Sequence, residues 1–284
     1  MNKTLIGKNN YLFLINDSAR ELEVHCDNLN LVNDKALKQY NFSNYMMILY
    51  PNKSYYYKHF LPNNYIVKYR PAFEIYKQIF KNKILDCYEF LKDIDDVYYK
   101  TDSHINLKGN YEVYLKFIEK VNSDYKINLK NRHINIKVKN NVELSSLGYG
   151  IGDLTWPTNL GEQILVDKND NYYYSNDFND FYMKHFINNE DGILFFDYEL
   201  NNKTNELNKK VVEWDILSKY IIYKKNNHGK KFILFYDSFL INILPLYMEI
   251  FDEVYFIKSH YNEKLINIIK PDFVFEFRVE RFLT

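Results

Sequence analysis

The spacing of hydrophobic positions is most regular in the last third of the chain. Lys231–Tyr236 is a nearly continuous apolar run, typical of a strand buried on both faces of a parallel sheet. Apolar residues then recur at helical spacing from Phe239 to Phe251, and Pro245 is expected to bend or restart that helix. Three more segments follow: a strand at Glu253–Ile257, a helix at Glu263–Lys270 and a strand at Phe273–Phe277. This β-α-β-α-β order predicts parallel strands with right-handed crossovers.

The first half of the chain shows the same alternation less regularly. Tyr45–Tyr50 is a compact apolar run that ends at Pro51, which indicates a buried strand, and Leu107–Val121 has the spacing of an amphipathic helix. Shorter segments are predicted as a helix at Phe73–Phe80, a strand or turn at Asp95–Lys100, and strands at Ile134–Val138, Gln163–Val166, Tyr172–Tyr174 and Gly192–Phe196. We therefore predict one α/β domain over residues 1–284, with a central mainly parallel sheet flanked by helices. Residues 140–205 are predicted as a small irregular β-containing insertion.

The composition limits which classes of binding partner are expected. The 284 residues carry 37 basic and 37 acidic side chains, and a net charge of zero argues against a general electrostatic grip on nucleic acid. The 28 Tyr and 21 Phe have two explanations, an AT-rich genome or a surface on which sugars stack. Cys26 and Cys87 form no metal-binding pattern, and we expect buried thiols in a reducing compartment and no bound metal.

No apolar run approaches the length of a membrane span, and no secretory signal is recognisable at the start of the chain. We therefore expect a cytoplasmic protein without a transmembrane segment, or a periplasmic one if an N-terminal signal has been removed.

Ser238 occupies the most informative position, directly after a predicted buried strand and before a predicted helix. Such a turn exposes side chains at the carboxyl end of a parallel sheet, where open α/β sheets place their sites. The helix N-terminus that follows could stabilise an oxyanion together with a second donor. The alternative is a helix cap, because Asp237 and Ser238 are both favoured capping residues.

A second candidate lies in Thr101-Asp102-Ser103-His104-Ile105-Asn106. Histidine is the usual base that activates a serine near neutral pH, and a carboxylate two residues away could orient its ring. Here too the alternative is capping of the following helix, by Asp102, Ser103 or Asn106.

Taken together, these segments resemble the polysaccharide O-acetyltransferases of the alginate-acetylation type, the AlgX/AlgJ-like proteins with an SGNH-hydrolase-like fold. The resemblance lies in short stretches spread over nearly the whole chain. These are Gly7–Leu14 (family pattern G-K-[DN]-[GN]-[WY]-L-F), Pro51–Tyr57 (P-x-K-x-x-x-Y), Thr101–Gly109 (T-D-[ST]-H-W-N-x-x-G), Gly152–Leu154 (G-D-L), Tyr236–Phe239 (G-D-S-F) and Pro271–Arg281 (a closing strand with an E-R pair).

The resemblance implies an SGNH-like sandwich in which Ser238 is the nucleophile, His104 the base and Asp102 its orienter. It also suggests four substrate-binding residues: Tyr236, Asp237, Lys53 and Arg281. Two positions depart from the family pattern. Tyr236 stands where the family has Gly, which would narrow the approach to Ser238, and Ile105 stands where the family has Trp.

The implied function is transfer of an acyl group, with acetyl as the first choice, to a hydroxyl of a surface polysaccharide or its sugar precursor. Another capsule substituent could use the same serine. We expect no bound cofactor, an acyl donor such as acetyl-CoA as co-substrate, a glycan or nucleotide-sugar substrate, and association with a polysaccharide assembly machinery. Two alternatives stay open: a carbohydrate O-acetyl esterase with the same triad, and a catalytically silent glycan-binding protein.

Overall fold

A computed structural model describes residues 3–32, 40, 42–140, 152–155, 170–178, 193–195, 220–224 and 229–283. The strand predicted at Gln163–Val166 lies outside these residues, as does most of the predicted insertion between 140 and 205. The insertion and the single-domain organisation therefore stay predictions.

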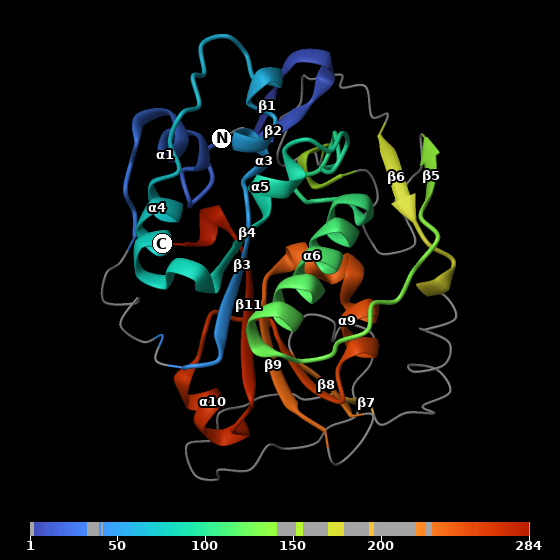
Figure 1. The fold of residues 1–284 in the computed structure, drawn as a ribbon. Coiled ribbons are helices and arrows are strands. Elements are labelled where there is room, and N and C mark those ends of the chain that lie inside the picture. Colours follow the sequence, from blue (N-terminus) through green and yellow to red (C-terminus); the bar gives the residue numbers. More distant parts are fainter. Residues whose placement is uncertain are drawn as a thin grey trace.

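A seven-stranded sheet forms the centre of the molecule (Figure 1). Its order is β4 (Ile84–Asp86), β3 (Tyr45–Tyr50), β11 (Phe273–Val279), β9 (Lys231–Tyr236), β10 (Glu253–Ile257), β8 (Tyr220–Lys224) and β7 (Ile193–Phe195). The strands from β4 to β10 are parallel, whereas β8 and β7 are antiparallel additions at one edge. The predicted α/β fold with a mainly parallel central sheet is confirmed, and so is the parallel pairing of the last three strands.

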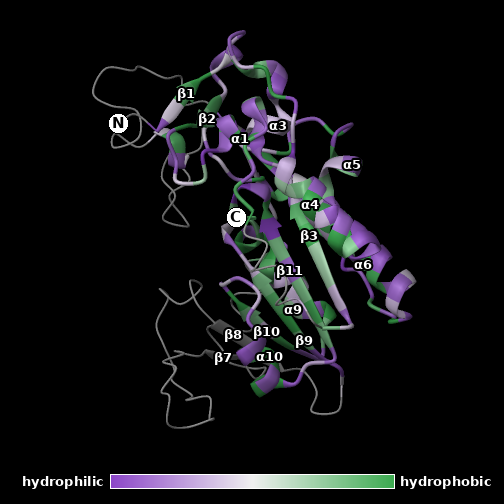
Figure 2. Cartoon of the chain, turned by 90° about the vertical axis from the view of Figure 1, so that its left-hand side faces the viewer, coloured by the Kyte–Doolittle hydropathy of each residue, from purple (hydrophilic) through white to green (hydrophobic). Residues whose placement is uncertain are grey.

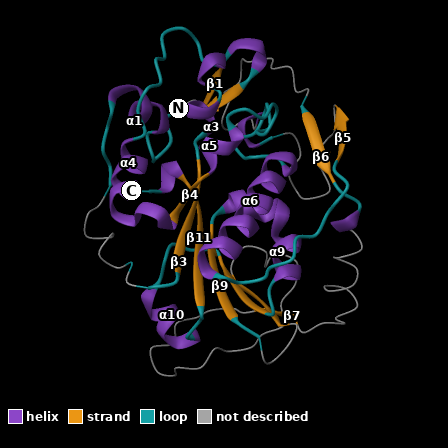
Figure 3. Cartoon of the chain, in the orientation of Figure 1, coloured by secondary structure: helices purple, strands orange, loops and turns teal. Residues whose placement is uncertain are grey.

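Both faces of the sheet are covered, which explains why its strands are continuously apolar. Side chains alternate across a strand, so Met46 and Ile48 of β3 enter one hydrophobic cluster, and Met47 and Leu49 enter another. The first cluster lies under α6 (Leu107–Tyr125) and α9 (Leu244–Ile250), and the second lies under α4 (Pro71–Phe80) and α10 (Glu263–Ile269). Figure 2 shows the hydrophobic colouring of the central strands, and Figure 3 shows the helices around them.

Local signals set several helix boundaries. Pro245 lies in the first turn of α9, and a 3-10 segment, Ser238–Ile243, precedes it, so the predicted restart of the helix at this proline is confirmed. Short helices α1 (Glu21–Asp27), α3 (Lys53–Tyr56) and α5 (Cys87–Leu91) lie near the carboxyl end of the sheet (Figure 1). None of the helices among the described residues is both long and apolar enough to cross a membrane.

Two small antiparallel sheets of two strands each complete the described structure. β1 (Thr4–Ile6) pairs with β2 (Leu12–Leu14), and β5 (Lys137–Asn140) pairs with β6 (Asn171–Tyr174). The strand predicted at Ile134–Val138 begins three residues later, and the β1–β2 hairpin was not predicted because its strands are only three residues long. The segment predicted as a strand or turn at Asp95–Lys100 is a loop in which Tyr98 pairs with Ile105.

Candidate active site

The turn after β9 presents Ser238 at the carboxyl end of the sheet. Its neighbour Asp237 does the capping: one carboxylate oxygen accepts from the backbone N–H of Phe239 at 2.9 Å, and the other accepts from the backbone N–H of Val279 at 2.8 Å. The capping alternative therefore falls on Asp237, which leaves the hydroxyl of Ser238 available for another partner. The 3-10 segment that follows is only six residues long. The predicted oxyanion role of this helix N-terminus stays a prediction.

The Asp102 carboxylate serves the adjacent histidine instead of a helix end. Its Oδ1 accepts from both the backbone N–H of His104 at 2.8 Å and the ring Nδ1 at 2.6 Å. Asn106 caps α6 by accepting from the backbone N–H of Gly109 at 3.0 Å. The capping alternative for this segment is thus taken by Asn106, and Asp102 orients the imidazole.

The two segments meet in space although His104 and Ser238 are 134 positions apart in the sequence. The Nε2 of His104 lies 2.7 Å from the Oγ of Ser238. The ionised Asp102 carboxylate can only accept hydrogen bonds, so Nδ1 carries the proton and Nε2 is left to accept from the serine hydroxyl. Asp102, His104 and Ser238 therefore form a continuous hydrogen-bonded chain, in the order that acyl-transfer triads use.

The surroundings of His104 stabilise its charged form relative to a histidine in water. Burial alone would lower the pKa of His104, but the Asp102 carboxylate beside Nδ1 outweighs it, and the pKa rises above its ordinary value. Burial would raise the pKa of Asp102, but the charge of His104 and several hydrogen bonds hold it well below its usual range. An imidazolium that forms at His104 is thereby stabilised, as a general base requires.

Asp153 completes the site, although its sequence context alone indicated no role for it. Its backbone N–H donates to Oδ2 of Asp102 at 2.9 Å, and its carboxylate accepts from the backbone N–H and the hydroxyl of Ser103, each at 2.7 Å. Gly152 permits this approach, because a Cβ atom at this position would lie 2.5 Å from the carbonyl oxygen of Thr101. The Gly152–Leu154 match was the signal that could have identified Asp153.

Lys53 lies behind the same loop and is almost completely buried. Its Nζ donates to the carbonyl oxygens of Lys100 at 2.9 Å and Asp102 at 2.8 Å, and it lies 5.9 Å and 5.6 Å from the ring centroids of Tyr11 and Phe13. Burial lowers the pKa of this amine to about 8, although nearby acidic groups oppose the shift. Lys53 therefore holds the backbone of the segment from Lys100 to Asp102 in place.

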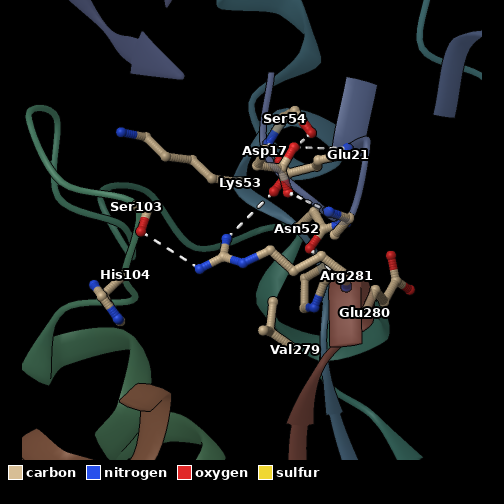
Figure 4. A network of polar contacts seen from close by, with 12 residues as sticks. Asp17, Glu21, Asn52, Lys53, Ser54, Ser103, His104, Val279, Glu280 and Arg281 are labelled. Atoms are coloured by element: carbon tan, nitrogen blue, oxygen red, sulfur yellow. Dashed lines mark hydrogen bonds and ion pairs between the residues drawn. The ribbon is translucent and has the colours of Figure 1, made fainter. Parts of the chain in front are cut away.

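Arg281 also acts on this loop from within the protein. Its guanidinium donates to Glu21 at 3.2 Å and to the hydroxyl of Ser103 at 3.4 Å (Figure 4). Tyr236 is completely buried in the hydrophobic cluster under α6 and α9, where it packs against the sheet. The substrate-binding roles of Tyr236, Asp237, Lys53 and Arg281 stay predictions, and each of these side chains is at least nine-tenths buried.

Among the described residues, Asp102, His104 and Asp153 also form a group whose side-chain atoms could reach one metal ion, since these atoms lie within 4.8 Å of one another. The same atoms are already engaged with one another, with Ser103 and with the backbone. The arrangement therefore fits an oriented imidazole more closely than an open metal site, and the expectation of no bound metal stays a prediction.

Comparisons with known proteins identify the fold. No family model matches the sequence, and no curated protein matches it. Among solved structures, Bacillus cereus PatB1 superposes with a TM-score of 0.63 at 18% identity, over 99% of this chain and 97% of that one. A DHHW family protein from Eubacterium siraeum gives 0.57 at 15% identity, over 100% and 92% of the two chains. The O-acetyltransferase domain of Pseudomonas putida AlgJ gives 0.53 at 13% identity, over 100% and 92%. The chain thus has the fold that its resemblance to the AlgJ-like proteins implied.

Proposed function

We propose that this protein is an O-acyltransferase in which Ser238 is the nucleophile, His104 the general base and Asp102 the residue that orients the base. The observation that carries the proposal is the hydrogen-bonded chain from Asp102 through His104 to the Ser238 hydroxyl, at the edge where parallel α/β sheets place their sites. The fold shared with an O-acetyltransferase domain supports the same class of reaction.

The proposed reaction has two acyl-transfer steps. His104 Nε2 takes the proton of Ser238 as Oγ attacks the carbonyl carbon of the donor, and the imidazolium returns that proton to the leaving group of the donor. The acyl group is then an ester of Ser238. A hydroxyl of the acceptor attacks this ester, Nε2 takes the hydroxyl proton, and Ser238 recovers a proton as the acylated acceptor leaves.

We further propose acetyl as the transferred group and a hydroxyl of a surface polysaccharide, or of its sugar precursor, as the acceptor. Within the cytoplasm, a soluble thioester such as acetyl-CoA would be the co-substrate. In a periplasmic setting, a membrane partner of a polysaccharide assembly machinery would deliver the acyl group. The neighbour named as an O-acetyltransferase domain supports acetyl over other substituents.

Intact-mass measurement after incubation with p-nitrophenyl acetate tests the nucleophile. We expect one acetyl adduct on Ser238, no adduct in Ser238→Ala, and much slower labelling in His104→Ala. Ser259→Ala is the matched control, because Ser259 follows β10 at the same edge of the sheet and its hydroxyl donates to the carbonyl oxygen of the adjacent His260 at 2.9 Å. A wild-type protein without an adduct on Ser238 would refute the proposal.

An esterase would use the same three residues, so the fate of the acyl group decides between the two activities. Release of acetate and acetylation of an added oligosaccharide are measured together, with and without the oligosaccharide. A transferase diverts the acyl group to the sugar and releases less acetate when the acceptor is present. Equal acetate release in both conditions, with no acetylated sugar, would assign the protein to the esterases.

A further inference from the structure

Asp153 reaches the proposed triad from a part of the chain about fifty positions away, in the 3-10 turn Asp153–Thr155. This turn is anchored on its far side, because the hydroxyl of Thr4 donates to the carbonyl oxygen of Leu154 at 2.7 Å. On its near side, Gly152 lies in close contact with the backbone of Thr101. The turn is therefore fixed between the β1–β2 hairpin and the loop that carries His104, residues 99–104, here called the histidine loop.

Asp153 contacts each residue of the segment Asp102-Ser103-His104 in a different way. Its backbone N–H occupies Oδ2 of Asp102, its carboxylate binds the backbone and side chain of Ser103, and its Oδ2 lies 3.8 Å from Nδ1 of His104. Oδ1 of Asp102 is thereby left to the imidazole, because the other oxygen already has a partner. The side chain of Asp153 is one-quarter exposed, so its charge is only partly screened by water.

We propose that Asp153 is a positioning residue that aligns the Asp102 carboxylate with the His104 ring and places a second negative charge beside that ring. This inference rests on the triad proposed above. Among the described elements, the charged groups with the largest effect on the imidazole are Asp102 on its own loop, Asp153 on the 152–155 turn and Arg281 after β11. The two carboxylates favour the imidazolium and the guanidinium opposes it.

The chain offers a matched control for the loss of a loop anchor. Asp170 accepts from the backbone N–H of Thr101 at 2.7 Å and from the Thr101 hydroxyl at 2.8 Å. Asp153 accepts from the same two groups of Ser103, two positions later in the loop. Asp170 is not among the largest influences on the pKa of His104, whereas Asp153 is. Asp153→Asn and Asp170→Asn therefore remove equivalent anchors, and only the first also removes a charge beside the ring.

The experiment is an NMR titration of the His104 imidazole in the full chain, with the pH–rate profile for p-nitrophenyl acetate measured alongside. In Asp153→Asn we expect the His104 pKa and the acid limb of the profile to move down by about one unit, and kcat to fall about tenfold. In Asp170→Asn we expect no shift of the His104 pKa. Asp153→Ser, which is also uncharged, provides a second variant if the Asn form does not fold.

An unchanged His104 pKa in the Asp153 variants, or an equal shift in Asp170→Asn, would overturn the inference and leave Asp153 a structural anchor only. The NMR titration does not need an active enzyme. If Ser238 takes no acyl adduct while the His104 pKa still moves as expected, the proposed function fails and the positioning of the ring by Asp153 stands.

Discussion

The two loops that meet at the carboxyl edge of the sheet are held by different kinds of contact. The Ser238 turn continues a buried strand, and the carboxylate of the preceding residue, Asp237, caps it. The His104 loop is closed by a single β-bridge between Tyr98 and Ile105 and leads into α6. Four side chains distant in sequence hold it: Lys53, Asp153, Asp170 and Arg281. The proposed nucleophile is therefore positioned by the strand and turn that carry it, whereas the proposed base is positioned by polar side chains from other parts of the chain. We expect substitutions in the first region to reduce stability and activity together, and those in the second to reduce activity more than stability.

The largest expected effect is common to both regions. Ser238→Ala and His104→Ala should each lower kcat/KM for acyl transfer by at least about 10³-fold, and the double variant should be no worse than either alone, since the groups act as one unit. Steady-state kinetics on the three variants measure this. Multiplicative losses in the double variant would show that the two side chains act independently and would contradict a shared catalytic role.

In the serine turn, Asp237→Ala should destabilise the whole protein. It leaves two buried backbone N–H groups, those of Phe239 and Val279, without their acceptor, at a combined cost of about 3 kcal/mol. Urea unfolding measures the loss, and activity should fall with it. Asp272→Ala is the matched control, because Asp272 accepts from the backbone of Lys231 at the exposed opposite end of β9 and should cost less than about 1 kcal/mol.

In the histidine loop, Lys53→Met should separate activity from stability. The variant keeps the length of the side chain but loses both hydrogen bonds to the loop carbonyls, so we expect kcat/KM to fall about 10²-fold. Removing a buried charge offsets part of the lost bonding, so the free energy of unfolding should change by less than about 2 kcal/mol. The exposed neighbour Lys58, changed to Met, is the control. If Lys53→Met loses as much stability as Asp237→Ala, the two loops do not differ in the way proposed.

The smallest expected effect is a dependence on pH that has opposite signs for activity and stability. Because the pKa of His104 is raised, the neutral base is lost as pH falls through that raised value, so the acid limb of the activity should lie above pH 6.5. The ion pair with Asp102 stabilises the fold fully below the unfolded histidine pKa of 6.5, and this contribution is lost as pH rises through the folded pKa.

Thermal unfolding of the wild type and of His104→Ala across this window measures the stability part. The difference in Tm between them should shrink as pH rises. A difference that grows with pH would mean that the histidine is buried as a neutral group. The polar side chains around it would then hold the geometry of the loop without stabilising a charge on the ring.

The sequence predicted most of the elements, because periodicity and local stop signals act within a few residues. The run Lys231–Tyr236 and the proline at 245 placed a strand, a turn and a restarted helix correctly, with Ser238 between them. The resemblance also selected Asp102 and His104. The sequence named Asp237 and Asn106 among several candidate caps but did not select them, because Asp, Ser and Asn at neighbouring positions are equally good caps until the backbone is fixed.

The features that could be predicted from the sequence are local: buried strands, amphipathic helices, and an Asp and a His close enough on one loop to share a proton. The tertiary structure alone decided that this loop meets Ser238, that β8 and β7 join antiparallel, and that Asp153 and Lys53 turn inward to hold the loop. The physical reason is the sequence separation over which each kind of interaction acts. Side-chain spacing encodes which face of an element is buried, but strand order and the packing of distant loops depend on contacts that no local pattern specifies.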